Sequence, residues 1–191
     1  MWDLRISTWN IRKCVGLDRR RDPHRVARVI SELDADIVAL QEADKRLGQR
    51  PAALSADLVA RETGLVVADA GGHEASVGWH GNALLLRKGF DVTDRRNIDL
   101  PGLEPRGALV FDLSKDDRKV RVVGVHLGLM RSSRVAQFAA IRNHLDDLEP
   151  MPTVIMGDFN EWSRRTSTEH LGEFDVHAPG KSFHSARPVL A

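Results

Sequence analysis

Short apolar segments of strand length recur along the chain, and near both ends they alternate with segments of helical periodicity. The expected strands are residues 4–10, 37–42, 65–69, 81–87, 90–97, 106–113, 119–126 and 153–156. Those in the middle follow one another across turn residues, which is typical of hairpins. Strands that alternate with helices at the ends and form hairpins in between predict an α/β domain with mixed sheets.

Helical segments are expected at three places. Pro23 begins the first, and the second runs from about Ala52 to Glu62 and stops at Gly64, a natural C-cap. The first and third have an apolar face at helical spacing, formed by Val26, Val29, Ile30 and Leu33 and by Val135, Phe138, Ile141, Leu145 and Leu148.

The length of 191 residues fits one domain, and no repeat, low-complexity tract or linker divides it. We therefore expect residues 1–191 to form a single domain. Cys14 is the only cysteine, which rules out an intrachain disulfide and fits a reducing compartment. No apolar stretch approaches the ~20 residues of a membrane helix, and no secretory signal is visible. A cytoplasmic protein without a transmembrane segment is expected.

The net charge of +1 does not select a polyanionic partner, but the charges are unevenly distributed. Residues 1–30 hold eight Lys and Arg against three Asp, a local charge of 8 − 3 = +5. This segment either helps to hold a phosphate-bearing substrate or is a solvated loop, and both interpretations stay open. Arg131 and Arg134 are further candidates to flank a phosphate backbone, and Trp79 and Trp162 are candidates for the edge of a site.

Polar residues stand at the ends of four expected strands: Asn10, Glu42, His126, Asp158 and Asn160. Taken singly, each has an ordinary explanation, such as a turn, an exposed strand end, a core histidine or an Asx turn. Ligand sites in α/β folds, however, gather outside the carboxyl ends of strands. The joint occurrence of these residues favours one shared site.

These residue types suit the hydrolysis of a phosphate ester, in which water attacks phosphorus while charge builds on oxygen. Mg²⁺ favours one or two carboxylates together with waters and substrate oxygens, so Glu42 is the best metal ligand and Asn10 its neighbour. Asp158 is suited to orient or deprotonate the water, and Asn160 to donate a hydrogen bond to a phosphate oxygen. His126 is suited to neutralise charge on the phosphoryl group.

Short motifs along almost the whole chain resemble those of the endonuclease/exonuclease/phosphatase superfamily, which includes pancreatic deoxyribonuclease and neutral sphingomyelinases. In order, they are Thr8-Trp9-Asn10-Ile11, Leu40-Gln41-Glu42, Gly81-Asn82-Ala83-Leu84-Leu85, Pro105-Arg106-Gly107-Ala108, Val125-His126-Leu127-Gly128 and Gly157-Asp158-Phe159-Asn160. The resemblance implies a four-layer sandwich of two mixed β-sheets packed face to face and flanked by helices. It also implies Mg²⁺ or Mn²⁺ as the cofactor.

The resemblance adds two residues to the site. Arg106 is similar to a phosphate-facing arginine of the deoxyribonuclease branch, and Asn82 stands where the family often has a site-lining polar residue. His126 occupies the histidine position of the deoxyribonuclease and sphingomyelinase branches. The chain contains no tyrosine, whereas the abasic-endonuclease branch places one near the phosphate. Abasic-site repair is therefore disfavoured.

The C-terminal end departs from the family pattern. Family members normally continue into a strand that carries an Asp and then a Ser-Asp-His, whose Asp helps to bind metal and whose His contacts phosphate. Here no Asp follows Asp175, no Asp-His occurs, and residues 182–185 resemble the segment just before the first of these elements. We interpret His184 as a loop residue. The expectation is a chain truncated at its C-terminus, with two strands missing and weak activity or none.

The function expected from the sequence is metal-dependent hydrolysis of phosphate esters by a phosphodiesterase. Its substrates would be nucleic acid (DNA or RNA) or phospholipid headgroups, with phosphorylated metabolites still open. The modest net charge tempers the nucleic-acid interpretation, because nucleic-acid binders usually carry more positive charge. The alternative is a non-catalytic phosphate-binding domain or an inactive fragment of such an enzyme.

Overall fold

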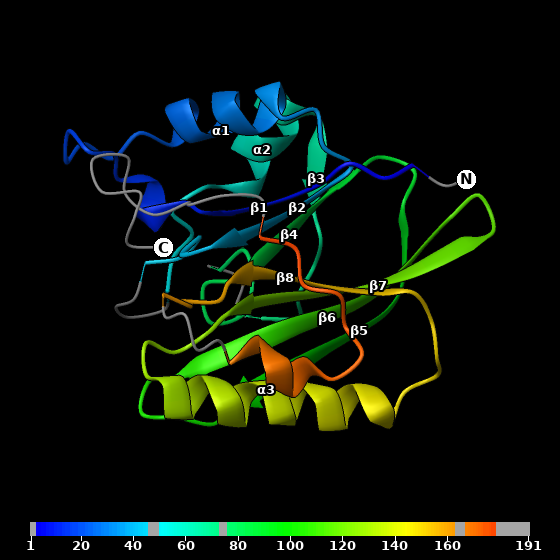
Figure 1. The fold of residues 1–191 in the computed structure, drawn as a ribbon. Helices are drawn as coiled ribbons and strands as arrows, with labels where there is room; N and C mark the ends of the chain where they lie inside the picture. Colours follow the sequence, from blue (N-terminus) through cyan, green and yellow to red (C-terminus); the bar gives the residue numbers. More distant parts are fainter. Residues whose placement is uncertain (1–2, 46–49, 73–75, 163–166, 179–191) are drawn as a thin grey trace.

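The computed structural model describes residues 3–178 except 46–49, 73–75 and 163–166. The described residues form a four-layer sandwich (Figure 1). Helices α1 (Pro23–Glu32) and α2 (Ala56–Thr63) cover the outer face of one sheet, and α3 (Arg131–Asp146) covers the outer face of the other. The predicted fold class is confirmed.

The first sheet has the strand order β1-β2-β4-β3. Its strands are β1 (Ile6–Asn10), β2 (Ile37–Gln41), β3 (Leu65–Val67) and β4 (Ala83–Arg87). The β1–β2 pair is parallel and the other two pairs are antiparallel. The sheet is therefore mixed, as predicted.

The second sheet has the order β5-β6-β7-β8. Its strands are β5 (Asp91–Leu100), β6 (Arg106–Lys115), β7 (Arg118–His126) and β8 (Thr153–Asp158). The hairpin pairs β5–β6 and β6–β7 are antiparallel, and β7–β8 is parallel because α3 carries the chain across between them.

Apolar side chains fill the spaces between the layers. In β2, Val38 packs toward α1 and α2, whereas its neighbour Ile37 packs between the two sheets. In β6, Phe111 packs between the sheets and Val110 packs toward α3. Because both faces of these strands are buried, they read as continuous apolar runs rather than as alternations.

The start of α2 differs from the prediction. The helix begins at Ala56 rather than near Ala52, because Ala52 pairs with Asp44 in a short antiparallel bridge. Ser55 caps the helix by accepting a hydrogen bond from the main-chain N–H three residues later. The predicted C-cap is confirmed, since Gly64 has a left-handed φ of 70°. None of the helices in the described residues has the length and hydropathy of a membrane span.

Parallel pairing brings strand ends together at one edge of each sheet. Asn10 ends β1 beside Gln41, the last residue of β2, and His126 ends β7 beside Asp158, the last residue of β8. β1 and β2 also contact β8 across the sandwich. The ends of four strands from two sheets therefore face one another.

Candidate active site

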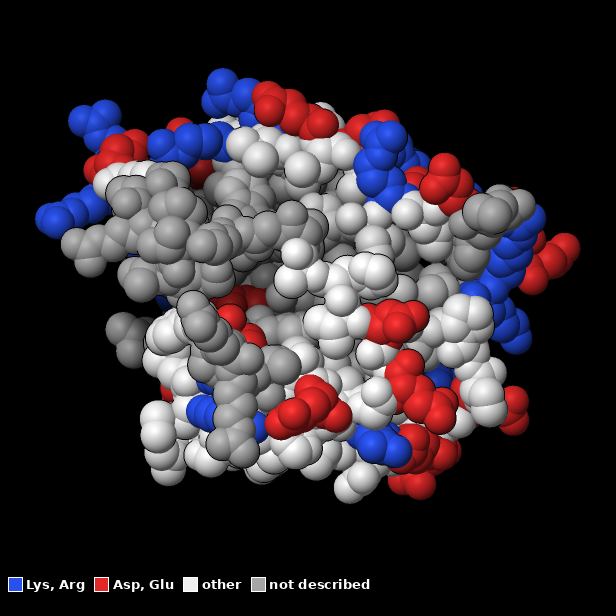
Figure 2. Space-filling view, in the orientation of Figure 1, with Lys and Arg blue, Asp and Glu red and all other residues white. Residues whose placement is uncertain are grey.

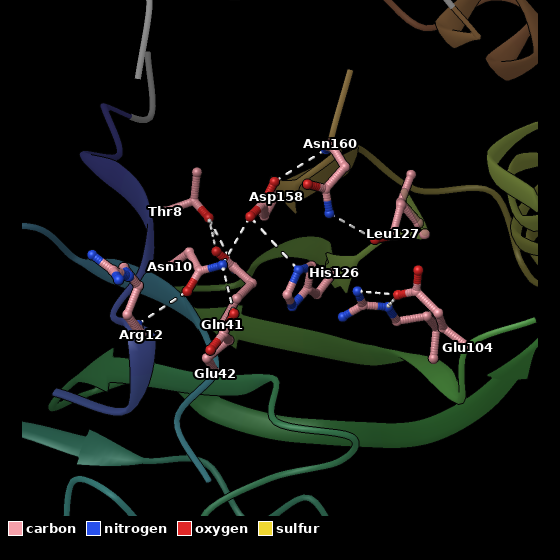
Figure 3. Close-up of polar contacts among 12 residues, drawn as sticks. Thr8, Asn10, Arg12, Gln41, Glu42, Glu104, His126, Leu127, Asp158 and Asn160 are labelled. Carbon is pink, nitrogen blue, oxygen red and sulfur yellow. Dashed lines mark hydrogen bonds and ion pairs between the residues drawn. The ribbon is translucent and has the colours of Figure 1, made fainter. Parts of the chain in front are cut away.

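A side-chain hydrogen bond between Asn10 and Asp158 joins the two sheets at this edge. Asn10 Nδ2 donates to Asp158 Oδ2 over 2.8 Å, and Asn10 Oδ1 accepts the main-chain N–H of Arg12 at 3.0 Å. Figure 3 shows Asn10 between Asp158 and Glu42, with His126 pointing toward Asp158. Both ends of the Asn10 amide are therefore held, and its orientation is fixed.

Glu42 follows the last residue of β2 and has a φ of 54°. Its Oε1 lies 3.5 Å from Asn10 Nδ2, and its Oε2 forms an ion pair with Lys13 Nζ. Burial raises the pKa of Glu42, but the hydrogen bond and charge of Lys13, with the charge of His126, outweigh burial and hold that pKa below its ordinary value of 4.5. Glu42 is therefore a half-buried carboxylate that stays ionised.

His126 and Asp158 are opposite one another in the parallel β7–β8 pair. His126 Nε2 lies 3.6 Å from Asp158 Oδ2, the same oxygen that accepts the Asn10 amide. The histidine is buried, with 5% of its surface exposed, whereas 29% of the Asp158 side chain is exposed. Solvent therefore reaches this pair from the carboxylate side.

The residues after β8 form the Asx turn that was one interpretation of the sequence. The Asn160 main-chain N–H donates to Asp158 Oδ1 at 3.0 Å, and Asn160 Nδ2 donates to the carbonyl of Leu127 at 2.9 Å. Asn160 has a φ of 51°, a conformation that Asn tolerates better than most residues. One Asn160 amide hydrogen is committed to Leu127, and the contact of the other with a phosphate oxygen stays a prediction.

Arg106 and Asn82 form contacts outside this cluster. Arg106, the first residue of β6, is buried and paired with Glu104 at 2.5 Å. Asn82, buried just before β4, donates its amide to the carbonyls of Gly107 at 2.9 Å and Trp79 at 3.2 Å. Asn82 therefore ties the first sheet to the start of β6. Its contact with a substrate phosphate, and that of Arg106, stay predictions.

Two supporting residues were not singled out in the sequence. Gln41 is buried and its Nε2 donates to Thr8 Oγ1 at 3.1 Å, which links β1 to β2 beneath Glu42. Lys13 counted only as part of a basic segment, although it contacts the predicted metal ligand. The signal for Gln41 was its place beside Glu42, and Lys13 had no comparable signal.

Cys14 lies in the single turn η1 (Arg12–Cys14) that follows β1. Its side chain is buried and its thiol donates to the carbonyl of Ala53 at 3.4 Å. Burial raises the pKa of Cys14 to about 11. The thiol is therefore a packed side chain and not a nucleophile.

The basic N-terminal segment is interleaved with acidic residues. Arg25 pairs with Asp18 at 2.8 Å, and Lys13 pairs with Glu42. Figure 2 shows acidic side chains among the Lys and Arg side chains along the top of the view, over α1 and the loop before it. The surface of this segment is thus of mixed charge.

The expectation that Arg134 flanks a phosphate backbone is wrong. Arg134 is buried, pairs with Glu161 at 3.1 Å, and donates to Ser167 Oγ and to the carbonyls of Gly128 and Leu129. It joins the loop after His126 to the loop after Asn160. Arg134 therefore stabilises contacts inside the protein, because a buried guanidinium needs all of these partners.

Other expected site residues fall at the periphery or outside the described chain. Arg131 pairs with Glu169 at 3.2 Å. Trp79 packs against the core between the sheets, and Trp162 is 54% exposed. His184 lies outside the described residues, as do the segments on which the expected C-terminal truncation rests.

The sequence matches the endonuclease/exonuclease/phosphatase family over residues 7–189. It is also similar to the uncharacterized protein YbhP of Escherichia coli K12, with 32% identity over 93 residues. That alignment covers 47% of this chain and 37% of YbhP. The match thus spans little more than a third of the length of this relative.

Solved structures share the fold. Truncated TDP2 of Caenorhabditis elegans is 20% identical with a TM-score of 0.64, over 82% of this chain and 62% of that one. The human Nocturnin catalytic domain, with bound sulfate, is 18% identical with a TM-score of 0.66, over 89% and 69%. A family protein of Bacteroides thetaiotaomicron is 16% identical with a TM-score of 0.67, over 88% and 68%.

Proposed function

Because the chain belongs to the endonuclease/exonuclease/phosphatase family, we propose that it hydrolyses phosphate esters in a reaction that depends on Mg²⁺ or Mn²⁺. The observation that carries the proposal is the meeting of Asn10, Glu42, His126 and Asp158 at the facing ends of two sheets. Because one fold supports many functions, these side chains and not the fold carry the assignment.

The donor set fits a hard divalent cation. Among residues 3–178 that the structure describes, no three His, Cys, Asp or Glu side chains gather as a metal cage. Mg²⁺, however, is usually held by one or two carboxylates and keeps waters and substrate oxygens as its other ligands. Glu42 is an ionised carboxylate with the Asn10 amide beside it. When bound there, the cation would stabilise negative charge on phosphoryl oxygens.

Asp158 has the fixed orientation that a water-orienting group needs. Its Oδ2 accepts from Asn10 and its Oδ1 accepts from the main chain of Asn160, so the carboxylate does not rotate freely. A carboxylate held in this way aligns a water molecule and takes its proton as the water attacks phosphorus. Asp158 is thus assigned as the water-orienting base.

His126 and Asn160 supply hydrogen-bond donors near that carboxylate. His126 Nε2 lies 3.6 Å from Asp158, and Asn160 keeps one amide hydrogen beyond its bond to Leu127. Donors fixed before the reaction stabilise the charge that develops on phosphoryl oxygens without a cost of reorientation. We assign both residues to the phosphoryl group.

We further propose a phosphodiester of nucleic acid or of a phospholipid headgroup as the substrate. The similar Nocturnin domain carries a sulfate anion, which has the tetrahedral shape of a phosphate. The half-exposed Trp162, two residues after Asn160, is suited to contact an apolar or aromatic part of such a diester.

Hydrolysis of bis-p-nitrophenyl phosphate, plasmid DNA and sphingomyelin tests the proposal. Each is measured with Mg²⁺, with Mn²⁺ and with EDTA, for the wild-type protein and for Asp158→Ala. We expect turnover of at least one substrate that requires both the metal and Asp158. Absence of such turnover in the product of the complete gene would contradict the proposal. Phosphate binding without turnover would favour the non-catalytic alternative.

A further inference from the structure

The ammonium group of Lys13 occupies the side of Glu42 where a cation is expected. Lys13 Nζ forms an ion pair with Glu42 Oε2, while Asn10 approaches the other carboxylate oxygen. The Lys13 side chain is 27% exposed and that of Glu42 is 18% exposed. The pair is therefore partly shielded from water, and its attraction exceeds that of a fully exposed pair.

The backbone holds Lys13 in this place. Its main-chain N–H donates to the carbonyl of Glu42 at 3.0 Å, so the two residues are joined by main chain and side chain. Arg12, Lys13 and Cys14 have φ values of 48°, 56° and 62°, three consecutive residues in the left-handed region. Such residues cost about 1–2 kcal/mol each, and they persist only where the surroundings fix them.

A lysine and a divalent cation at one carboxylate exclude each other. Both would neutralise the single charge of Glu42, and the two cations repel at short range. The lysine stem is flexible and its charge is compact, so its ammonium group can leave one anion for another. A substrate phosphate beside Glu42 would be such an anion.

We propose that Lys13 is an exchangeable partner of Glu42, which a divalent cation displaces and which then pairs with the substrate phosphate. This inference rests on the proposed function, because it assumes that the cation binds at Glu42. While Lys13 is paired with Glu42 it does not bind phosphate. A cation that takes its place at Glu42 releases Lys13 for the phosphate, so metal and phosphate bind with positive coupling.

The metal half is tested by the Mn²⁺ affinity, measured from the electron paramagnetic resonance signal of free Mn²⁺. Lys13→Met removes the competing charge and keeps the length of the side chain. We expect Mn²⁺ to bind about two- to fivefold more tightly to this variant, as expected from losing a partly exposed ion pair. Lys13→Arg should stay within twofold of the wild type.

Arg12→Met is the matched control. It removes the same unit charge from the same turn, but the Arg12 side chain is exposed and its main-chain N–H to Asn10 is kept. We expect its Mn²⁺ affinity to stay within twofold of the wild type. Unchanged or weaker Mn²⁺ binding by Lys13→Met, or equal tightening by both variants, would overturn the proposal.

The phosphate half is tested by calorimetric titration with inorganic phosphate. With saturating Mg²⁺ we expect Lys13→Met to bind phosphate at least about threefold more weakly than the wild type, and in EDTA the two should agree. Tighter Mn²⁺ binding with no loss of phosphate affinity would overturn the phosphate half.

Glu42→Gln separates this inference from the proposed function. Suppose that this variant loses Mn²⁺ affinity and the wild type hydrolyses a diester. Lys13 variants that then lack the expected changes in Mn²⁺ and phosphate affinity would contradict the exchange of Lys13 but not the proposed function. If Glu42→Gln binds Mn²⁺ like the wild type, the cation site lies elsewhere and the exchange is overturned. Absence of metal-dependent turnover instead contradicts the proposed function.

Discussion

Asn10 Nδ2 lies 2.8 Å from Asp158 Oδ2, a hydrogen bond between residues 148 positions apart that joins the end of one sheet to the end of the other. The same amide lies 3.5 Å from Glu42. One uncharged side chain therefore stands between two carboxylates and keeps them in a fixed relation. Stability of the sandwich and geometry of the site depend on the same contact.

Asn10→Asp should damage both properties. It keeps the size of the side chain but replaces the donor by a third carboxylate beside Glu42 and Asp158. We expect the free energy of unfolding to fall by about 1.5–3 kcal/mol and metal-dependent turnover to fall by about 10²–10³-fold. Urea unfolding and diester hydrolysis measure the two effects.

The control is Asn97→Asp, in which an exposed Asn loses a 2.8 Å side-chain donation to the carbonyl of Ala70. It should lower stability without an effect on turnover. Full activity of Asn10→Asp would show that this contact is only structural.

Gly157→Ala should shift Asp158. Gly157 has a φ of 153°, and a Cβ there would lie 1.9 Å from the carbonyl oxygen of Val125 on the neighbouring strand. Strain and overpacking together should cost about 2–6 kcal/mol. Gly64→Ala is the comparison. Gly64 has a φ of 70°, and a Cβ there would meet no atom within 4 Å apart from those of its chain neighbours. This variant should therefore cost about 1–2 kcal/mol. Equal melting temperatures of the two variants would refute the steric argument.

Asp112→Asn should remove a stabilising buried pair and its pH dependence. Asp112 pairs with Arg121 at 2.7 Å, and both side chains are less than 10% exposed. Burial raises the pKa of Asp112, but the hydrogen bonds and charges of Arg121 and Arg96 lower it below 3.8. The ionised pair therefore stabilises the fold above pH 3.8, and this contribution is lost as the pH falls through the lower folded pKa.

We expect the variant to lose about 3–5 kcal/mol near neutral pH, because Arg121 stays buried without its partner. The difference from the wild type should shrink as the pH is lowered below 3.8, measured by urea unfolding. Asp34→Asn, which breaks exposed ion pairs with Arg5 and Arg87, should have a much smaller effect. A difference that is constant with pH would contradict the assignment.

Arg134→Met should destabilise the protein and loosen the site. The substitution removes the buried cation beside Glu161, whose side chain is 13% exposed, and frees the carbonyls of Gly128 and Leu129. A loss of about 3–5 kcal/mol is expected, together with reduced turnover at saturating substrate. Arg131→Met breaks an exposed pair with Glu169 and should cost no more than about 1 kcal/mol. Similar losses in both variants would show that burial of Arg134 contributes nothing.

The order of apolar runs and helical segments predicted an α/β domain with mixed sheets, whereas the four layers were predicted only from the resemblance to the family. The sequence also predicted Asn10, Glu42, His126 and Asp158 as neighbours, because each stands at a strand end and parallel strands end at one edge. Their hydrogen bonds could not be predicted, since these depend on how closely the two sheets approach.

The remaining residues depend on contacts distant in the chain. Arg134 looked like a surface cation because its partners Glu161 and Ser167 follow 27 and 33 residues later. Lys13 looked like one charge among many because the left-handed turn that aims it at Glu42 has no Gly to mark it. The start of α2 was misplaced because the bridge between Asp44 and Ala52 has no local signature.

The labelling of Cys14 by a thiol reagent reports on movement at the edge of the site. The Cys14 thiol is buried, its pKa is raised to about 11, and it belongs to the same turn as Lys13. A thiol reagent reaches it only when that turn detaches, so the labelling rate counts the openings of the segment. Any ligand that tightens or releases Lys13 will change the labelling rate of Cys14, and no label needs to be engineered into the chain.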